Sequence, residues 1–443
     1  MGVSDYVVAI DLGSSKIVGC LGKKEADGKV RLLAMEQKPF RTEVRRGIVY
    51  NIEEISKSIM DLVQVLSDNK EHPCKIDQVY VGLNGYTIRT LDVSSTSYLS
   101  GDELVNERHL DELSDDAQSQ LPENLDVMDV FTQEFLVDGQ SDINPVGSMP
   151  KRVEGHYKIV GGKSAIMRNL ETCFDRTHTS FECILGPLAS AEAILRPEDK
   201  SKGVVAIDFG AQTTSVCIYK GNMVRYVSVL PFGGDNVTKD LLQLNIDEIE
   251  AERLKINKGT AIHFTQNNDD QPENEFAKMS EFDKEAIDIM VARMEEIVEN
   301  IWAQIRYSGI EPQKLTEGLV LTGGASQIEG LSELLIKKTG MNVRFGKVNQ
   351  YILPENMDKY SNPTLALTMG LLLLGQEGGC SVPEPIEVKK PEAPKEQRID
   401  FNVVVEEPVV KPTKPVKPPK PPKPPRDNPF KKIMKNFFDD EDL

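Results

Sequence analysis

A chain of 443 residues with a net charge of −18 is too long for one hydrophobic core, and its acidity argues against general nucleic-acid binding. Its six cysteines are scattered without metal-ligand spacing and no signal peptide precedes them, which predicts reduced thiols in a cytoplasmic protein. The longest apolar run, residues 365–374, is too short to span a bilayer and predicts a buried helix.

Residues 1–85 have the pattern of an α/β unit. The spacing of apolar residues predicts strands at 6–11, 17–22, 30–36 and 79–83. It predicts a helix over 52–66. The first strand runs into a polar turn, Asp11-Leu12-Gly13-Ser14-Ser15-Lys16. Glycine lets backbone N–H groups approach phosphate oxygens, serine donates, and aspartate can hold hydrated Mg²⁺. An ordinary strand-ending turn is the alternative for this copy alone.

Residues 86–163 differ in texture. Short strand candidates at 86–91 and 130–137 accompany an acidic, helix-like stretch at 102–119. No phosphate-type turn occurs among them. The segment therefore predicts a small inserted domain for protein contacts.

Residues 164–200 return to the first unit, with a helix over 165–174 and a strand over 181–185. The helix predicted for 186–195 is rich in small residues, which would let it pack closely on a neighbour, and Pro197 should end it.

The opening pattern then recurs. Residues 203–214 repeat Val-Val-Ala-Ile-Asp-x-Gly, with Asp208, Gly210, Thr213 and Thr214 in place of the first turn's polar residues. Two copies far apart in one chain predict two similar domains with a nucleotide between them.

Two further glycine turns follow. Gly233-Gly234-Asp235 opens a helix over 237–244, where free N–H groups would suit a phosphate or Asp235 would cap the helix. Gly323-Gly324-Ala325 follows a strand and precedes a helix over 328–338, as a nucleoside contact or as a tight turn. Between them lie helices predicted at 249–255 and 282–307 and a surface loop at 266–275.

The carboxyl end has its own composition. Residues 381–429 hold fourteen of the twenty-six prolines, which predicts a semi-rigid polyproline II spacer. Residues 428–438 then predict an amphipathic helix whose apolar and basic side chains separate to two faces. These are Phe430, Ile433, Met434, Phe437 and Phe438, with Lys431, Lys432 and Lys435. An anionic membrane is the favoured surface, and docking on a protein groove is the alternative. The acidic end, 439–442, should weaken attachment.

Two Asp-x-Gly turns, a Gly-Gly-Asp helix start, a Glu-x-x-Lys helix and a Thr-Gly-Gly turn, in that order, resemble the actin, Hsp70 and hexokinase superfamily. Within it, the chain resembles the FtsA family of bacterial cell-division proteins. Three features carry that narrower resemblance: the segment 135–152, the loop Arg46-Gly47-Ile48-Val49, and the proline-rich linker with its terminal helix.

The resemblance implies an α/β, actin-like two-domain fold with an inserted small α+β subdomain, then a disordered linker and an amphipathic helix. The implied boundaries are 1–85 with 164–200 for subdomain 1A, 86–163 for the inserted subdomain 1C, 201–235 with 308–378 for 2A, 236–307 for 2B, 379–427 for the linker, and 428–443 for the membrane-targeting helix with its acidic end.

It also implies ATP and Mg²⁺ in the cleft, with Asp11 and Asp208 near the metal. The implied nucleotide-binding residues are Asp11, Gly13, Ser14, Ser15, Lys16, Asp208, Gly210, Thr213, Thr214, Gly233, Gly234, Glu252, Lys255, Gly323, Gly324 and Ala325.

The function implied is a scaffold that polymerises and anchors FtsZ filaments to the cytoplasmic face of the inner membrane at the division septum. The FtsZ carboxyl-terminal peptide would bind 236–307, with Arg293 or Arg306 as contacts, and other division proteins would bind subdomain 1C. A sugar-type kinase or ATPase on the same fold is the alternative, and an Hsp70-like chaperone would need a substrate-binding β-domain that the proline-rich tail cannot supply.

Two departures from the superfamily pattern bear on chemistry. Ala211 and Gln212 follow Gly210 where more glycine is usual, so the side chain at 212 would crowd the γ-phosphate or add a hydrogen bond. Gly186-Pro187 stands where fast ATPases place Glu or Gln to orient water, and neither residue can do so. We therefore expect ATP binding with slow or negligible hydrolysis, in a protein that is not primarily an enzyme.

Overall fold

The computed structural model describes residues 5–381, apart from residues 41, 101, 264–278, 349–351, 355–361 and 377. The described residues belong to one compact unit, Met1–Pro385. Within them, no helix is both long and apolar enough to cross a membrane. The linker from 382, the terminal helix and the loop predicted at 266–275 lie outside the described residues.

The first sheet has six strands in the order β12-β7-β1-β2-β3-β18. Its strands are β1 (Tyr6–Leu12), β2 (Lys16–Lys24), β3 (Val30–Pro39), β7 (Gln78–Leu83), β12 (Ser180–Leu185) and β18 (Ile352–Pro354). The first three form the predicted antiparallel meander, and β7 and β12 add in parallel. Helix α1 (Ile52–Ser67) packs on β2 and β3, and Asn51 caps it by accepting the Glu54 N–H.

The second sheet has nine strands in the order β10-β9-β11-β8-β15-β14-β13-β16-β17. Five of these strands come from the part of the chain after residue 203 and lie side by side in the sheet. They are β13 (Val204–Phe209), β14 (Thr214–Lys220), β15 (Met223–Leu230), β16 (Leu319–Thr322) and β17 (Val343–Phe345). The meander β13-β14-β15 repeats that of the first sheet, so the two copies of the sequence pattern form equivalent strands.

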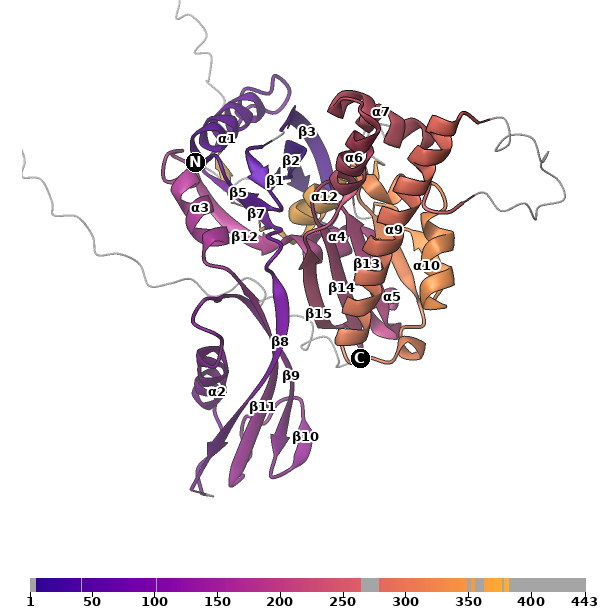
Figure 1. Cartoon of the computed structure of the whole chain (residues 1–443). Helices are drawn as coiled ribbons and strands as arrows, with labels where there is room; N and C mark the ends of the chain where they lie inside the picture. The colour runs from indigo at the N-terminus through magenta and orange to yellow at the C-terminus, as the bar shows by residue number, and fades with distance from the viewer. Residues whose placement is uncertain are drawn as a thin grey trace, which may run out of the picture. The chain divides into compact units, whose positions relative to one another are not determined.

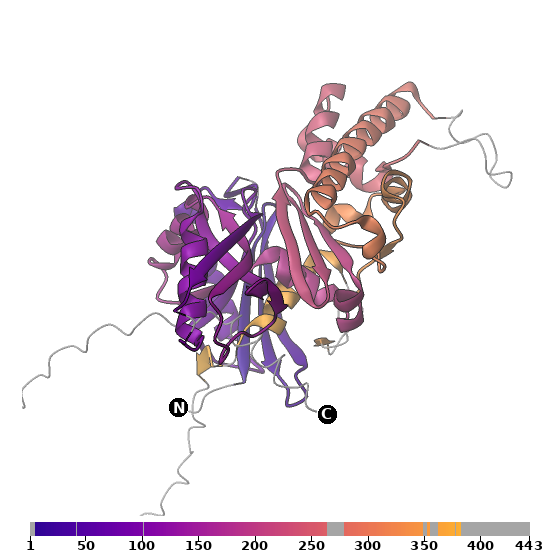
Figure 2. The same cartoon turned by 90° about the horizontal axis from the view of Figure 1, so that it is seen from below.

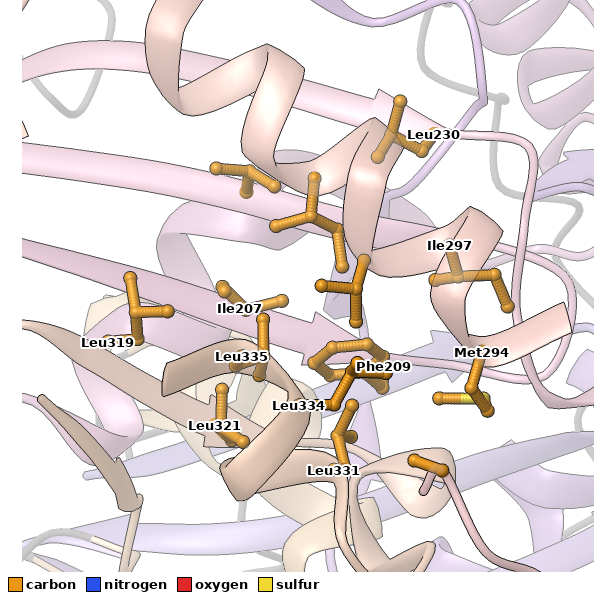
Figure 3. Packing of buried hydrophobic residues seen from close by; sticks show 14 of the residues in the cluster. Ile207, Phe209, Leu230, Met294, Ile297, Leu319, Leu321, Leu331, Leu334 and Leu335 are labelled. Carbon is orange, nitrogen blue, oxygen red and sulfur yellow. The ribbon is translucent and has the colours of Figure 1, made fainter. Parts of the chain in front are cut away.

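One hydrophobic core cluster lies between strands β13–β17 and helices α9 (Glu281–Tyr307) and α10 (Leu331–Thr339). Figure 3 shows Phe209, Ile207 and Leu321 of the strands against Leu331, Leu334 and Leu335 of α10 and Met294 and Ile297 of α9. Phe209 is almost fully buried. The apolar residue after Asp208 therefore anchors the second turn to this core, which fixes where the carboxylate emerges.

The inserted subdomain comprises the other four strands of the sheet and one helix (Figure 1). These are β8 (Arg89–Tyr98), β9 (Asp126–Val137), β10 (Gln140–Asp142), β11 (Arg152–Gly162) and α2 (Glu107–Ser119). Leu113 and Ala117 of α2 pack on alternate residues of β11, including Val153 and Tyr157. A small α+β subdomain was predicted here, and β8 begins at Arg89, three residues later than predicted.

Two helices connect the halves of the molecule. Helix α4 (Gly186–Ile194) packs on β13 and β14, and α12 (Ala366–Leu374) packs on β1, β2 and β7. The helices also pack on each other, between the strands of the two sheets (Figure 2). A Cβ on Gly370 would lie 1.7 Å from the Ala189 carbonyl oxygen, so only glycine permits this approach. The prediction of close packing by the small residues of 186–195 is confirmed.

The remaining elements are short. They are β4 (Val44–Arg45), β5 (Ile48–Val49), β6 (Lys75–Ile76), β19 (Cys380–Ser381), α3 (Ala165–Phe174), α5 (Pro197–Lys202), α6 (Gly234–Leu241) and α7 (Glu248–Lys258), with 3₁₀ turns at Leu242–Leu244, Pro312–Lys314, Gly324–Gln327 and Pro363–Leu365.

Three predicted boundaries are wrong, whereas helix α4 ends before Pro197 as predicted. The range 308–378 for subdomain 2A extends too far, because β18 pairs with β3 and α12 packs on the first sheet. The linker does not begin at 379, since β19 pairs with β6. Pro197 begins α5 as well as following α4, because proline suits the first helical position. Helix α10 begins at Leu331 rather than at residue 328, because a 3₁₀ turn follows the glycines.

Candidate functional site

Both Asp-x-Gly turns open into one cavity of about 590 Å³. Fourteen of the sixteen residues predicted to bind nucleotide line it: Asp11, Gly13, Ser14, Ser15, Lys16, Asp208, Gly210, Thr213, Gly234, Glu252, Lys255, Gly323, Gly324 and Ala325. Because these residues come from both sheets and from α6, α7 and the turn after β16, the fold brings together segments that the sequence keeps apart.

The first turn ends β1 and is tight. A Cβ on Gly13 would lie 2.7 Å from the Lys16 carbonyl oxygen, so glycine is needed there. The Lys16 ammonium donates to the Thr364 hydroxyl at 3.0 Å, and the Ser14 hydroxyl accepts the Gly47 N–H at 3.4 Å. The turn thus presents a cation and two hydroxyls to the cavity beside the Asp11 carboxylate.

The second turn ends β13 and has different partners. The Asp208 carboxylate accepts the Ser190 hydroxyl of α4 at 2.6 Å. Gly323 has a φ of +87°, and a Cβ on it would lie 2.4 Å from Asp208 Oδ1. The turn after β16 therefore approaches the second carboxylate with bare backbone, which is the close approach that the Gly-Gly pattern predicts.

Burial and mutual repulsion control the charges at the two turns. Burial, together with the neighbouring Asp208 carboxylate, raises the pKa of Asp11 to about 7, although Lys16 opposes both effects. Burial also raises the pKa of Asp208, against the Ser190 hydrogen bond. Burial lowers the pKa of Lys16, although Asp11 favours its charged form. Two such carboxylates are a donor set for a hydrated divalent cation, which would relieve their repulsion.

No group of three or more potential metal-ligating side chains occurs in the part of the chain that the structure describes. Mg²⁺ commonly takes only one or two protein carboxylates and completes its shell with water and phosphate oxygens. Asp11 and Asp208 fit that mode of binding.

The start of α6 corrects two expectations. The N–H groups of Gly234 and Asp235 donate to the carbonyls of Gly210 and Ala211 at 3.0 and 2.7 Å, so they are not free for a phosphate. Gly233 is the N-cap and does not line the cavity; a Cβ there would lie 2.4 Å from the Ala211 carbonyl oxygen. Asp235 lies inside the first turn and is not the cap. The paired glycines allow the start of α6 to pack closely against the backbone of the second turn.

Thr214 is the other predicted residue that does not line the cavity. Its side chain is fully buried and donates to the Phe232 carbonyl at 2.8 Å. The residues on either side, Thr213 and Ser215, do line the cavity. Successive side chains point to opposite faces of an extended chain, so Thr213 and Ser215 face the cavity while Thr214 faces away from it.

The wall formed by α7 has a bonded cluster. The Lys255 ammonium pairs with Glu252 at 2.7 Å and donates to the Thr238 hydroxyl at 2.9 Å, while Thr238 donates to Glu252 at 2.6 Å. This cluster fixes the orientation of the Glu-x-x-Lys pair. Ile256, the next residue of α7, also lines the cavity although it is 70% exposed. An exposed apolar side chain on this wall suits the flat face of a base.

Sequence reasoning missed several lining residues, including Asn84, Gly47, Ser215, Gln327 and Thr364. Asn84 could have been predicted from the sequence, because it directly follows β7. The carboxyl end of β7 lies beside that of the parallel strand β1, which carries Asp11. A Cβ on Gly186 would lie 1.9 Å from Asn84 Oδ1. The Asn84 carboxamide therefore occupies the space beside Gly186.

The two arginines proposed as partner contacts differ. Arg293 pairs with Asp240 and Glu296, and its side chain is 22% exposed. Arg306 lies over the Trp302 ring and is 56% exposed, with Glu299 3.6 Å away. Arg306 is the more accessible of the two, and Arg293 is held by its own subdomain.

Comparison with known proteins supports the interpretation of the motifs. The family model for cell division protein FtsA matches residues 205–370, and the model for the SHS2 domain inserted in FtsA matches 85–161. Together these segments cover more than half of the chain. The chain belongs to the FtsA family of cell-division proteins.

Individual relatives agree with the FtsA assignment. The chain is 28% identical to cell division protein FtsA of Neisseria meningitidis serogroup B over 86% of its own length and 92% of the relative. It is 29% identical to the FtsA of Pseudomonas aeruginosa over 85% and 91%. Among solved structures, the PilM-PilN type IV pilus biogenesis complex matches with a TM-score of 0.59 at 15% identity, covering 83% of this chain and 97% of that one. The actin-like fold with an inserted subdomain is confirmed.

Proposed function

We propose that the chain binds ATP with Mg²⁺ in the cavity between its two turns. The convergence of fourteen predicted residues on one cavity of about 590 Å³ carries the proposal. Lys16, Ser14 and Ser15 would contact phosphate oxygens, and Asp11 and Asp208 would hold the hydrated metal. The bound metal would supply charge neutralisation at the phosphates. Glu252 and Lys255 would flank the nucleoside opposite Gly323 and Gly324.

We also infer that hydrolysis is slow. Helix α4 begins with Gly186 and Pro187, neither of which can polarise water, and the Asn84 carboxamide fills the adjacent space. A steady-state rate on the order of 1 s⁻¹ or faster, as in ordinary enzymes, contradicts this inference.

Titration of the full-length chain with a fluorescent ATP analogue, with and without Mg²⁺, tests the binding proposal. We expect saturable binding that Asp208→Ala weakens at least tenfold, and Mg²⁺ should tighten binding to the parent but not to the variant. Asp92→Ala is the matched control, because Asp92 lies in the inserted subdomain and pairs with Lys158. Equal affinities for parent and Asp208→Ala exclude this cavity as the site.

The cellular role that we propose is a polymerising tether that links FtsZ filaments to the anionic cytoplasmic face of the inner membrane at the septum. Membership of the FtsA family supports a division role, and the amphipathic pattern of 428–438 supports membrane attachment. The FtsZ carboxyl-terminal peptide would bind subdomain 2B near Arg306, which is exposed and beside Trp302.

Co-sedimentation with anionic vesicles and FtsZ tests the tether. The full chain should bring FtsZ to vesicles, and both Phe437→Asp and deletion of 428–443 should abolish this. The control for the point variant is Phe345→Asp, on an exposed phenylalanine of β17. Recruitment of FtsZ that survives the deletion contradicts the tether. Arg306→Glu should weaken peptide binding about tenfold, since it reverses the charge of an exposed side chain at the proposed contact.

A further inference from the structure

Gln212 connects the second turn to two other segments. Its neighbours Ala211 and Thr213 line the cavity, but Gln212 itself does not. Its Oε1 accepts the Arg46 backbone N–H at 3.0 Å, and its Nε2 donates to Asp235 Oδ2 at 3.0 Å. A backbone donor on one side and a carboxylate acceptor on the other fix the orientation of the carboxamide, because only its oxygen accepts and only its nitrogen donates.

The Arg46 side of this connection belongs to the first domain and is rigid. Arg46 and Gly47 join β4 to β5 with φ values of 49° and 73°, a conformation that few sequences adopt. A Cβ on Gly47 would lie 1.9 Å from the Asn84 carbonyl oxygen, so the turn is pressed against the end of β7. The Arg46 carbonyl also accepts the Tyr86 N–H at 3.1 Å. The donor that Gln212 meets is therefore held in place by subdomain 1A.

The same turn contacts the first phosphate loop. The Gly47 N–H donates to the Ser14 hydroxyl, which remains able to donate its own proton to a phosphate oxygen. Hydrogen bonds thus run from Ser14 through the Arg46-Gly47 turn to Gln212 and on to Asp235 at the start of α6. This chain of bonds joins the two domains on one side of the cavity.

We propose that Gln212, with the Arg46 N–H and the Asp235 carboxylate, is a latch that closes the cavity and sets the rate at which bound nucleotide leaves. The proposal rests on the proposed nucleotide-binding function. Release requires the domains to separate, and separation breaks the bond between the Arg46 N–H and the Gln212 carboxamide, which its bond to Asp235 within the second domain keeps oriented. The side chain at position 212 does not line the cavity and instead makes hydrogen bonds to protein on both sides.

The bond to Asp235 is charge-assisted and the site is half-buried, so losing the latch should have a measurable effect. The one bond that crosses between the domains, at ordinary net strength, corresponds to about a tenfold change in a rate or an equilibrium constant. The first test is the dissociation rate of a fluorescent ATP analogue from the full-length chain, measured by chase with excess ATP. Q212A should release it about tenfold faster than the parent.

A reciprocal exchange makes the test specific. Q212E keeps an acceptor for the Arg46 N–H but places a carboxylate against Asp235, so release should be at least as fast as from Q212A. Q212E/D235N exchanges the carboxylate and the carboxamide between the two positions, which restores both bonds, and release should return to within about threefold of the parent. Q118A is the matched control, because Gln118 bonds only within α2, and its release should be unchanged.

A second readout separates the latch from nucleotide binding itself. Hydrogen exchange at the Arg46 amide, measured without nucleotide, should be about tenfold faster in Q212A and parent-like in Q212E/D235N. If the parent binds no nucleotide, the proposed function and the latch's effect on release both fail. Unchanged exchange at Arg46, unchanged release from Q212A, or failure of the double variant to slow release overturns the latch while leaving nucleotide binding intact.

Discussion

The turns after β1 and β13 carry the same seven-residue pattern, yet their polar residues do different things. The first turn presents Lys16 and two serines to the cavity, beside Asp11. The second presents Asp208, which α4 holds through Ser190, and uses Gln212 and Thr214 for bonds to protein rather than to the cavity. The first copy therefore adds a cation to the cavity, whereas the second uses most of its polar side chains for contacts with protein.

The apolar residues that the two copies share are those whose apolar character is required by burial. Val-Val-Ala-Ile must be apolar in both copies because these residues are buried in a sheet covered on both faces. The hydroxyls and amides beyond the glycine face partners from other segments, such as Gly47 and Phe232, which differ between the copies. Repetition of a motif therefore predicts backbone geometry more reliably than side-chain roles.

The largest effect that we expect is on the free energy of unfolding, where the backbone of Gly323 lies close to Asp208 of the second turn. Gly323→Ala should lower the free energy of unfolding by about 3 kcal/mol, since its Cβ would meet Asp208 Oδ1 at 2.4 Å in a left-handed conformation. Gly340→Ala is the matched control: its φ is +69° but nothing lies within 4 Å, so the loss should be about 1 kcal/mol. Urea unfolding measures both. If both variants lose the same free energy of unfolding, the close contact between Gly323 and Asp208 contributes nothing beyond backbone strain.

The next effect tests the charge of the first turn. Lys16→Ala should weaken binding of ATP with Mg²⁺ about a hundredfold, because a partly buried ammonium beside phosphate oxygens makes charge-assisted bonds. Lys23→Ala, on the same strand but exposed and paired with Asp5, is the control and should bind normally. Calorimetric titration gives the affinities. A loss of less than threefold for Lys16→Ala would remove the main distinction between the two turns.

A pH effect follows from the raised pKa of Asp11. Because the folded pKa of about 7 exceeds the ordinary aspartate value of 3.8, the stability that Asp11 contributes is fully present below the unfolded pKa and is lost as pH rises through the folded one. Without metal or nucleotide, stability should fall by about 1.4 kcal/mol between pH 6 and pH 8. Asp11→Asn should flatten this part of the profile, and Mg²⁺ should stabilise the parent more at pH 8 than at pH 6. A profile identical in Asp11→Asn would assign the titration to another group.

Much of the fold could be predicted from the sequence, since strands such as β1 and helices such as α9 are long and strongly periodic. Boundaries failed where distant contacts decide the outcome. Residues 352–354 form a strand only by pairing with β3, and Cys380 only by pairing with β6. At the site, glycines and carboxylates were found because few residue types suit their positions. Asn84 and the Gln212 bonds were not, because an amide has no sequence signature until its partners are known.

The smallest effect compares two adjacent threonines of the second turn. Thr214→Val should cost about 1 kcal/mol of stability, because the Phe232 carbonyl loses its donor, while ATP affinity changes less than twofold. Thr213→Val should do the reverse, with stability kept and affinity lowered about fivefold, because only Thr213 lines the cavity. Thermal unfolding and titration on the same samples separate the two quantities. If Thr214→Val lowers affinity as much as Thr213→Val, then the second turn uses both hydroxyls as the first turn uses its two serines, and the division of labour between the turns fails at this pair.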